Sequence, residues 1–263
     1  MLIGLNAVLF GGFDAETAFR CTAMAGYDAI ELSALPGMAE HITFEGWRDE
    51  VPSLLKLSAE HGLPVSALEV ANPDMGVLSK AFEMAGALGC PIVNIGSGGP
   101  ADDESAWAAT IENLARAADA AETAGILLCV KAHVGLAVHN TATSLRALAE
   151  IPNLHLDMDP SHVHRAGEDP VKALGEVANR IRHVHIRDCK GRQGPPGPPP
   201  LQANGRGDID LVGYVRVLHE HGFDGPVNLE VIGARELDLL QCQTIAAESR
   251  GHMQASLQAC GAR

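Results

Sequence analysis

The 263-residue sequence has few aromatic residues and no long apolar run. Phe, Trp and Tyr make up 4% of it while hydrophobic residues reach 46%, so aliphatic side chains must supply most of any core. No stretch approaches the roughly 18 uncharged apolar residues of a membrane span. The apolar N-terminus, MLIGLNAVLFGGF, has no basic flank and contains Asn6, which indicates a first strand and not a signal peptide. We therefore expect a cytoplasmic protein with no membrane partner.

Positive charge and paired cysteines are also scarce. The chain has 19 Lys and Arg against 33 Asp and Glu, a formal net charge of −14. A protein that follows a nucleic-acid backbone needs a basic face, so no nucleic-acid partner is expected. The six cysteines are widely spaced, with no CxxC pair, which is typical of reduced thiols in a cytoplasmic protein.

Short apolar runs alternate with Ala-, Leu- and Glu-rich stretches along the whole chain. Strands are predicted at 3–9, 28–32, 64–70, 91–95, 126–131, 154–159, 182–187 and 227–231. Helices are predicted at 15–25, 46–61, 76–88, 104–124, 141–150, 170–179, 211–221 and 236–258. Such alternation requires parallel pairing through helical crossovers. No GxGxxG follows the first strand, so the α/β class expected is one (β/α)8 TIM barrel spanning residues 1–263.

One segment departs from this regular composition. Residues 194–200 read GPPGPPP, which suits neither a helix nor a central strand. The segment follows the seventh predicted strand, so in a barrel it belongs to the face that carries active sites. A surface insertion and a lid over the substrate are equally compatible with this position.

Polar side chains recur where the predicted strands end. Pro160 removes a backbone donor and favours an extended residue before it, so the sixth strand stops with the carboxylate of Asp159 at its tip. In a barrel, all such strand ends meet at one mouth. Charged groups this close to buried strands are costly unless they are paired or bound to a metal. The candidate residues are Glu31, Glu69, Lys131, His133, Asp159, His162, His185, Asp188 and Glu230.

Alternation along the strands predicts a second polar layer below this mouth. If the strand-end residues point inward, the residues two positions earlier face the same side. They would either orient the upper side chains or form a hydrogen-bonded polar set in the core. These residues are Asp157, His183 and Asn228.

Several segments resemble one known family. GYDAIEL, LDMDPSH followed by AGEDP, IRHVHIRD, and GRGDID with GFDGPVNLE are similar to the xylose isomerase-like TIM barrels. That group includes sugar isomerases, ketose 3-epimerases, inosose isomerases and dehydratases, and an endonuclease IV branch. The resemblance implies a small-molecule carbohydrate substrate and is compatible with a homodimer or homotetramer. The endonuclease branch is not expected, because its additional histidines are replaced here by Glu69 and Asn94.

The resemblance also implies a divalent metal held by a Glu, an Asp, a His and a Glu after strands five to eight. By position the last three are Asp159, His185 and Glu230, but Lys131 stands where the first Glu is usual. An ammonium has no lone pair and cannot ligate. Either Mn, Zn, Fe, Co or Mg persists on three ligands, with water or His133 completing the set, or Lys131 replaces the metal, or a deprotonated Lys131 forms a Schiff base.

The chemistry expected of such a site is proton abstraction next to a carbonyl, through an enediolate. A metal or Lys131 would polarise the carbonyl, Glu230 would act as base, and Glu69 or His133 would serve the opposite face. The leading prediction is an isomerase or epimerase of a keto sugar or keto polyol. Alternatives are a dehydratase-type lyase using Lys131 with or without metal, and a non-catalytic sugar-binding subunit. Substrate contacts are expected from His162, Arg187 and Glu31.

Overall fold

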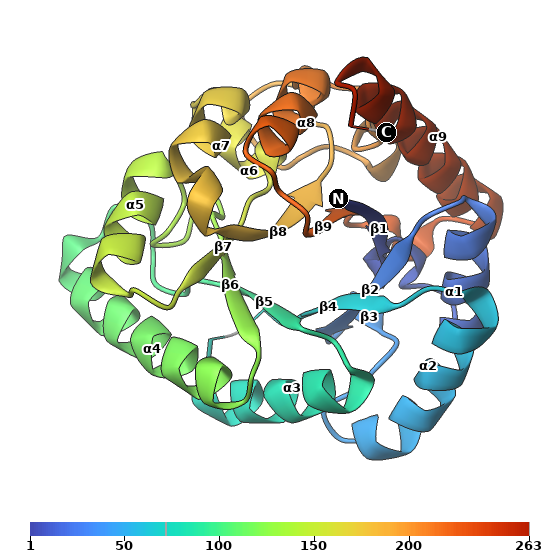
Figure 1. The fold of residues 1–263 in the computed structure, drawn as a ribbon, viewed down its shortest axis with the longest axis horizontal. Helices are drawn as coiled ribbons and strands as arrows, with labels where there is room; N and C mark the ends of the chain where they lie inside the picture. Colours follow the sequence, from blue (N-terminus) through green and yellow to red (C-terminus); the bar gives the residue numbers. More distant parts are fainter. Residues whose placement is uncertain (72, 263) are drawn as a thin grey trace.

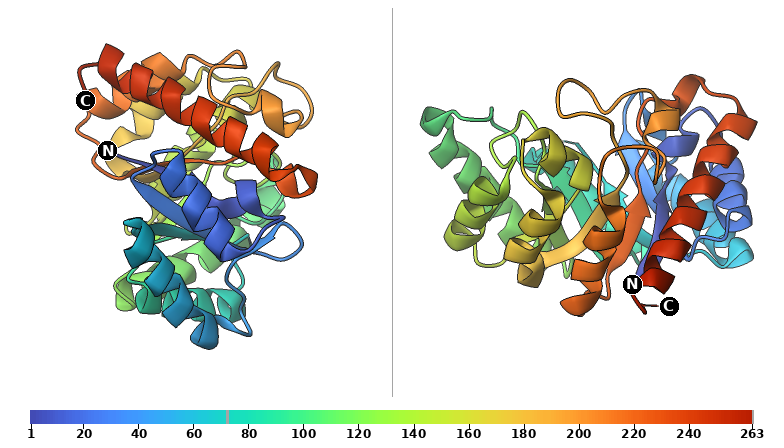
Figure 2. Two further views of the ribbon diagram at one scale, coloured as in Figure 1. Left: turned by 90° about the vertical axis from the view of Figure 1, so that its right-hand side faces the viewer. Right: turned by 90° about the horizontal axis from the view of Figure 1, so that it is seen from above.

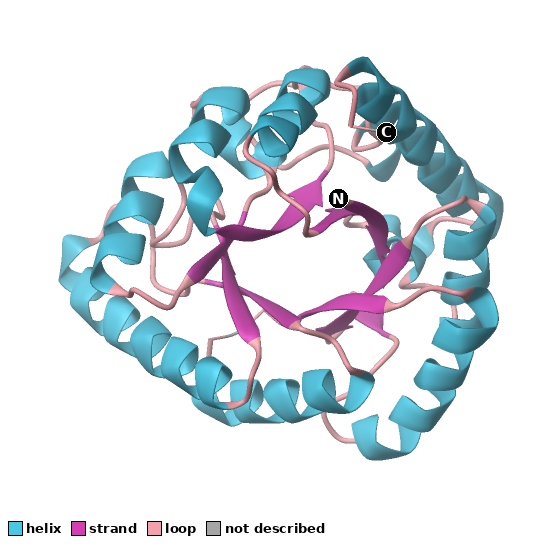
Figure 3. Ribbon diagram, viewed as in Figure 1, coloured by secondary structure: helices cyan, strands magenta, loops and turns pink. Residues whose placement is uncertain are grey.

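The computed structural model describes residues 1–71 and 73–262, and in them eight parallel strands close into a barrel. β1 pairs with both β2 and β9, which completes the cylinder seen end-on in Figures 1 and 3. The prediction of a (β/α)8 barrel is confirmed. The barrel strands are β1 (Leu2–Asn6), β2 (Ala29–Leu35), β4 (Val65–Glu69), β5 (Ile92–Gly96), β6 (Leu127–Lys131), β7 (His155–Asp157), β8 (Ile181–Ile186) and β9 (Pro226–Leu229).

Helices surround the strands as an outer ring (Figure 3). Most begin at an Asp or Asn whose side chain accepts a backbone N–H of the first turn, as Asp103 does for α4 and Asp238 for α9. Apolar helix faces pack on the outer faces of the strands and form the main core there. The ring consists of α1 (Ala15–Met24), α2 (Trp47–His61), α3 (Met75–Leu88), α4 (Glu104–Thr123), α5 (Thr141–Glu150), α7 (Pro170–Val177), α8 (Leu211–Glu220) and α9 (Leu239–Ala259).

Several short elements were not predicted as such, and most of them lie in the segments that follow strands. The first strand ends at Asn6, and the 3-10 helix η1 (Ala7–Phe10) follows it. The second strand continues to Leu35, where the short β3 (Ala39–Glu40) pairs with it in antiparallel fashion. After β7, the helix α6 (Pro160–Arg165) begins at Asp159, whose side chain caps it. The turn η2 (Ala178–Arg180) leads into β8.

The long segment between β8 and α8 lies at the end of the barrel opposite the two termini (Figure 2, right). Asp188 anchors its base by accepting backbone N–H groups of Cys189, Gly205 and Ile209. Gln202 ties it to the loop after β9 through two hydrogen bonds with the backbone of Ile232. The proline-rich part includes η3 (Pro199–Leu201), and η4 (Ala234–Glu236) precedes α9.

Two further observations concern the chain as a whole. All six cysteines are free thiols, and five of them are buried. In the part of the chain that the structure describes, no helix combines the length and the apolar character needed to span a membrane.

Candidate active site

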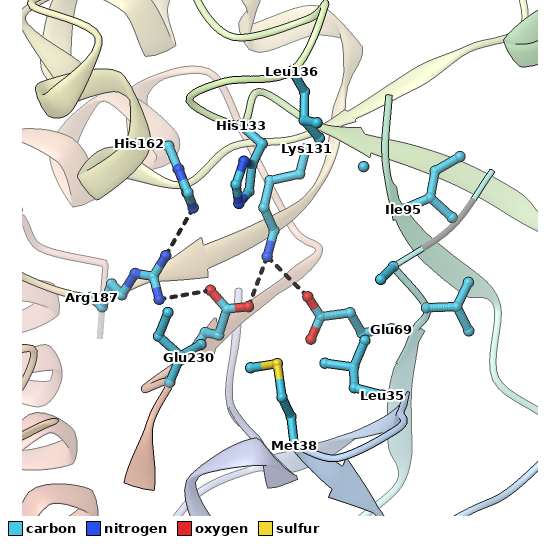
Figure 4. A pocket seen from close by; sticks show the side chains of 14 residues that line it. Leu35, Met38, Glu69, Ile95, Lys131, His133, Leu136, His162, Arg187 and Glu230 are labelled. Carbon is cyan, nitrogen blue, oxygen red and sulfur yellow. Dashed lines mark hydrogen bonds and ion pairs between the residues drawn. The ribbon is translucent and has the colours of Figure 1, made fainter. Parts of the chain in front are cut away.

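A cavity of about 370 Å³ opens at the carboxyl ends of the strands. Its charged and imidazole side chains gather on one side, and aliphatic side chains form most of the remaining wall (Figure 4). No residue of the 194–200 segment lines this cavity among those the structure describes, which gives no support to a lid at this position. The lining residues are Leu35, Met38, Glu69, Val70, Ala71, Ile95, Gly96, Lys131, His133, Leu136, His162, Arg187, Glu230 and Ile232.

Lys131, the last residue of β6, connects two carboxylates of the cavity. Its Nζ donates to Glu69 Oε1 at 3.0 Å and to Glu230 Oε1 at 2.7 Å, and the three side chains are almost fully buried. An ammonium has three N–H donors, so one remains for a ligand in the cavity. Figure 4 shows this ammonium between the two carboxylates.

Arg187 forms a second cationic centre next to the first. Its Nη1 lies 3.3 Å from Glu230 Oε2, and its Nη2 lies 3.0 Å from Asp159 Oδ2 and 2.9 Å from His162 Nε2. Its Nε donates to Ser161 Oγ at 2.8 Å. Glu230 therefore faces Lys131 with one oxygen and Arg187 with the other.

The two carboxyl groups beside Lys131 differ in their acidity. Burial raises the pKa of Glu69, and the charge of Lys131 offsets this only in part. Burial acts in the same direction on Glu230, but Lys131 and Arg187 outweigh it and hold the pKa of Glu230 well below its ordinary value. The difference leaves Glu230 ionised, as a base must be before it accepts a proton, and makes Glu69 the more readily protonated of the two, as a proton donor must be.

Lys131 itself is an ammonium and not a free amine. Burial alone would lower its pKa, but Glu230 and Glu69 raise the pKa of Lys131 well above its ordinary value. A Schiff base requires the deprotonated amine. The site thus disfavours the Schiff-base alternative.

His133 and His162 stack on the other side of the cavity, with ring centroids 3.9 Å apart. Burial and the charge of Lys131 lower the pKa of His133, and burial and Arg187 hold the pKa of His162 well below its ordinary value. Both imidazoles are therefore neutral. His133 faces the Val134 carbonyl with Nδ1, which leaves its Nε2 as a hydrogen-bond acceptor, whereas the two nitrogens of His162 face the Val134 N–H and Arg187.

A fully buried polar layer lies under the cavity, inside the barrel. Asp157 lies 2.9 Å from His183 Nδ1 and 2.7 Å from His185 Nδ1, and Glu31 Oε2 lies 2.8 Å from His185 Nε2. Asn228 donates to the same oxygen of Glu31 at 2.9 Å and lies 2.8 Å from His183 Nε2. The layer expected below the mouth, Asp157 with His183 and Asn228, is thus present as a connected network.

The sequence-based candidates divide between these two levels. Glu69, Lys131, His133, His162, Arg187 and Glu230 all line the cavity, whereas Asp159, His185 and Glu31 lie beneath its lining. Glu31 was expected at a strand end, but β2 continues four residues past it, so its side chain points into the buried layer. Asp188 anchors the loop after β8 instead of facing the cavity.

Sequence reasoning missed the aliphatic wall and two polar supports. Asn6 donates to Glu69 Oε2 at 2.8 Å, and Ser161 accepts from Arg187. The end of β1 at Asn6 would have indicated the first of these, since Asn6 closes a strand as the other candidates do. Nothing in the sequence marks Leu35, Leu136 or Ile232 as cavity residues, because apolar residues at strand ends are common in any barrel.

Two groups of side chains in residues 1–71 and 73–262 could hold a metal ion by proximity: Glu31 with His183 and His185, and Glu69 with His185 and Glu230. Asp159 belongs to neither group. The donor atoms, however, lie beside charged or polar partners, although Glu230 Oε2 and His185 Nδ1 form ion pairs without hydrogen-bond geometry. Lys131 bridges Glu69 and Glu230, and both nitrogens of His185 face carboxylates. In this arrangement the residues do not fit a divalent metal, and no step below uses one.

The fold and the cavity define the class: a (β/α)8 barrel with a polar pocket of enzyme type at the carboxyl ends of its strands. The chain belongs to the xylose isomerase-like TIM barrel family, whose model matches residues 19–256. The resemblance noted in the sequence is therefore confirmed.

Curated relatives of this chain include two kinds of enzyme. An inosose dehydratase of Geobacillus kaustophilus is 37% identical over 90 residues, which is 33% of this chain and 29% of that one. An inosose dehydratase of Clostridium beijerinckii is 25% identical over 147 residues, 49% of this chain and 48% of the relative. A ketose 3-epimerase of Arthrobacter globiformis is 26% identical over 261 residues, 88% of this chain and 83% of the relative. The chain spans less than half the length of these two dehydratases, so its activity is inferred below and not transferred.

Solved structures support the same fold. The probable 3-DHS dehydratase AsbF of Bacillus anthracis superposes with a TM-score of 0.78 at 14% identity and covers 97% of this chain and 99% of its own. A D-allulose 3-epimerase from Methylomonas sp. gives a TM-score of 0.75 at 19% identity over 98% of each chain. At these identities the likeness concerns the barrel alone.

Proposed function

We propose that this protein is an enzyme that moves a proton on the carbon next to a carbonyl of a keto sugar or keto polyol, as an isomerase or epimerase. The observation that carries the proposal is the Lys131 ammonium held between Glu69 and Glu230 on the polar side of the cavity. A cation with one free N–H stabilises the oxyanion that develops when such a proton leaves. Two carboxylates beside it supply the proton-transfer groups.

The named relatives support the substrate class. A ketose has its carbonyl next to carbon 3, and an inosose is a cyclic keto polyol, so both enzyme names imply chemistry beside a ketone. The cavity of about 370 Å³ has room for a molecule of that size. Its aliphatic wall suits the C–H face of a sugar or a polyol ring, while the polar side addresses the oxygens.

In the proposed reaction the carbonyl oxygen accepts the free N–H of Lys131, and Glu230 removes the proton from the neighbouring carbon to give an enediolate. Return of a proton to the opposite face from Glu69 gives epimerisation, and return to the other carbon of the enediolate gives isomerisation. His133 is neutral and accepts a substrate hydroxyl at Nε2, and His162 packs beside it with its nitrogens on Val134 and Arg187. Arg187 holds Glu230 and Asp159 in place.

The second candidate is a dehydratase, which the matches to inosose dehydratases favour. The same enediolate would then expel a hydroxyl from the next carbon, and Glu69, whose raised pKa makes it the more readily protonated carboxyl group, would donate the proton with which that hydroxyl leaves as water. The cofactor expected from the sequence, a divalent metal on Asp159, His185 and Glu230, would require these side chains to leave their present partners. Cytoplasmic location and self-association into a homodimer or homotetramer remain predictions.

The experiment is proton NMR in D₂O on a panel of keto sugars and inososes. Wild-type protein should exchange the hydrogen next to the carbonyl for deuterium, and Lys131→Met should slow this exchange by about 10²–10⁴-fold because the oxyanion loses its cation. Lys56→Met is the matched control, since Lys56 is exposed on α2 and pairs only with Glu60. Appearance of an unsaturated product would favour the dehydratase, and binding without exchange or turnover would indicate a sugar-binding subunit.

A further inference from the structure

Each carboxylate around the cavity has a cationic or N–H neighbour at both oxygens, although Glu230 Oε2 and Asp159 Oδ2 form ion pairs without hydrogen-bond geometry. Glu230 faces Lys131 at 2.7 Å and Arg187 at 3.3 Å. Asp159 faces Arg187 with one oxygen, and the other accepts the backbone N–H of Ser161 at 2.7 Å. Glu69 faces Lys131 with one oxygen and accepts from Asn6 with the other. No carboxylate oxygen of these three lacks a cationic or N–H neighbour.

The imidazole that could complete a metal site is engaged in the same way. His185 Nε2 lies 2.8 Å from Glu31 Oε2, and its Nδ1 lies 2.7 Å from Asp157 Oδ2. A ring nitrogen that ligates a metal carries no proton, so it cannot also donate a hydrogen bond to a carboxylate. Metal binding through Nε2 would therefore require His185 to leave Glu31, whereas its Nδ1 contact with Asp157 could remain.

The charges are already balanced to within one unit without a metal. Glu69, Asp159 and Glu230 contribute three negative charges, and Lys131 and Arg187 contribute two positive charges. A divalent ion among these carboxylates would lie beside two almost fully buried cations. Burying like charges together is strongly unfavourable, so the pair Lys131 and Arg187 opposes the ion both by charge and by occupying its donors.

We propose that Lys131 and Arg187 together replace a divalent metal in this site, so that the chain works without a metal ion and Lys131 is the group that contacts the reacting carbonyl. Arg187 is a positioning residue, because it reaches the carboxylates and His162 from the side of β8. The catalytic part of this statement rests on the proposed function. The part about metal binding stands on the side-chain geometry alone.

The same geometry predicts how the site could be converted. Replacing Lys131 by Glu removes the ammonium and adds a carboxylate between Glu69 and Glu230, close to His185. The set then has four carboxylates against one cation, together with an imidazole. Carboxylate and imidazole donors of this kind bind Mn²⁺, Co²⁺ or Zn²⁺. The variant should therefore gain a metal site that the natural chain lacks.

The experiment compares wild type, Lys131→Glu and the surface control Lys56→Glu, each incubated with Mn²⁺ or Co²⁺ and then dialysed. Metal is measured by elemental analysis, and the melting temperature is recorded with and without the ion. Wild type and control should retain almost no metal and show no shift. Lys131→Glu should retain roughly one ion per chain and melt at a higher temperature when it is present, since an ion that binds only the folded state stabilises it.

Stoichiometric metal in wild type, lost in Asp159→Ala, would overturn the proposal. A folded Lys131→Glu that binds no ion would also overturn the claim that Lys131 excludes it. If that variant does not fold, the wild-type measurement still decides, and deuterium exchange that persists in excess EDTA supports the proposal. Metal content is measured without turnover. A protein that binds no metal but turns over no substrate of the panel would therefore contradict the proposed reaction and still support the proposal about metal binding.

Discussion

Glu69 and Glu230 reach the Lys131 ammonium from different strands of the barrel, β4 and the end of β9. β1 and β2 separate these strands in the sheet, so the carboxylates approach the cavity from different directions. At the scale of single residues, this arrangement offers two proton positions around one oxyanion site. One carboxyl group can then remove the proton and the other can return it, and substitution of each residue tests its role.

Replacing Glu69 by Gln should separate exchange from epimerisation. Glu230 would still remove the proton and return it to the same face, so deuterium incorporation should continue within about tenfold of wild type. Inversion needs a proton donor on the other face and should fall by about 10²–10⁴-fold. NMR in D₂O measures both rates in one sample. Glu230→Gln, in contrast, should slow exchange and inversion together; loss of both in Glu69→Gln, with exchange retained in Glu230→Gln, would reverse the two assignments.

At the scale of elements, β1 and β9 pair so that the inward face of β1 has no room for a side chain at Gly4. Gly4 in β1 pairs with Asn228 in β9, and a Cβ built on Gly4 would collide with the Asn228 side-chain oxygen. Asn228 is one of the groups that hold Glu31 and His183 in the buried layer. The absence of a side chain at position 4 therefore allows this part of the layer to form.

Gly4→Ala should lower the free energy of unfolding by about 1–3 kcal/mol, because the added methyl displaces Asn228 in a close-packed interior. Gly251→Ala is the matched control, and its effect on the free energy of unfolding should not be destabilising. Gly251 lies within α9, and a Cβ there meets nothing within 4 Å, so this change should be neutral or stabilise by roughly 0.5–1 kcal/mol. Urea unfolding of both variants measures the difference. Equal effects in the two variants would contradict the proposed contact.

The elements that sequence predicted well are those with local signals. Alternating apolar runs, Asp caps and glycines after helices specify most strands and helices to within a few residues. α6 was missed because six residues carry too little periodicity, although Pro160 and Asp159 are typical of a helix start. β2 was predicted to end at Leu32, and that error placed Glu31 at the mouth of the barrel instead of below it.

The partners of the site residues could not be predicted in the same way. Alternation correctly grouped His183 with His185 on one side of β8, but it could not say that His185 turns towards Asp157 and Glu31. Likewise, the sequence placed Lys131 at the end of β6. Its hydrogen bonds to Glu69 and Glu230, however, join residues that lie 62 and 99 positions away in the chain. Such contacts are set by how the barrel closes and not by any local pattern.

At the scale of the whole molecule, the buried layer links strands around the barrel. Glu31 in β2, Asn94 in β5, Asp157 in β7, His183 and His185 in β8 and Asn228 in β9 are joined by hydrogen bonds or ion pairs. Despite burial, the two imidazoles hold the pKa of Asp157 well below its ordinary value. Burial likewise opposes the charge on His185, but Asp157 and Glu31 raise the pKa of His185 well above its ordinary value. The protonation of this layer is therefore coupled to global stability.

The free energy of unfolding should be greatest between the ordinary pKa of Glu, 4.5, and that of His, 6.5. Lowered carboxyl pKa values contribute stability that is present above the unfolded value and is lost as the pH falls. Raised imidazole pKa values contribute stability that is present below the unfolded value and is lost as the pH rises. Urea unfolding from pH 2 to 9 should show both limbs, and Asp157→Asn should flatten both, since it removes one lowered carboxyl and the partner that raises the imidazoles. Stability that keeps rising from pH 6.5 to 9 would mean that these imidazoles are neutral in the folded protein.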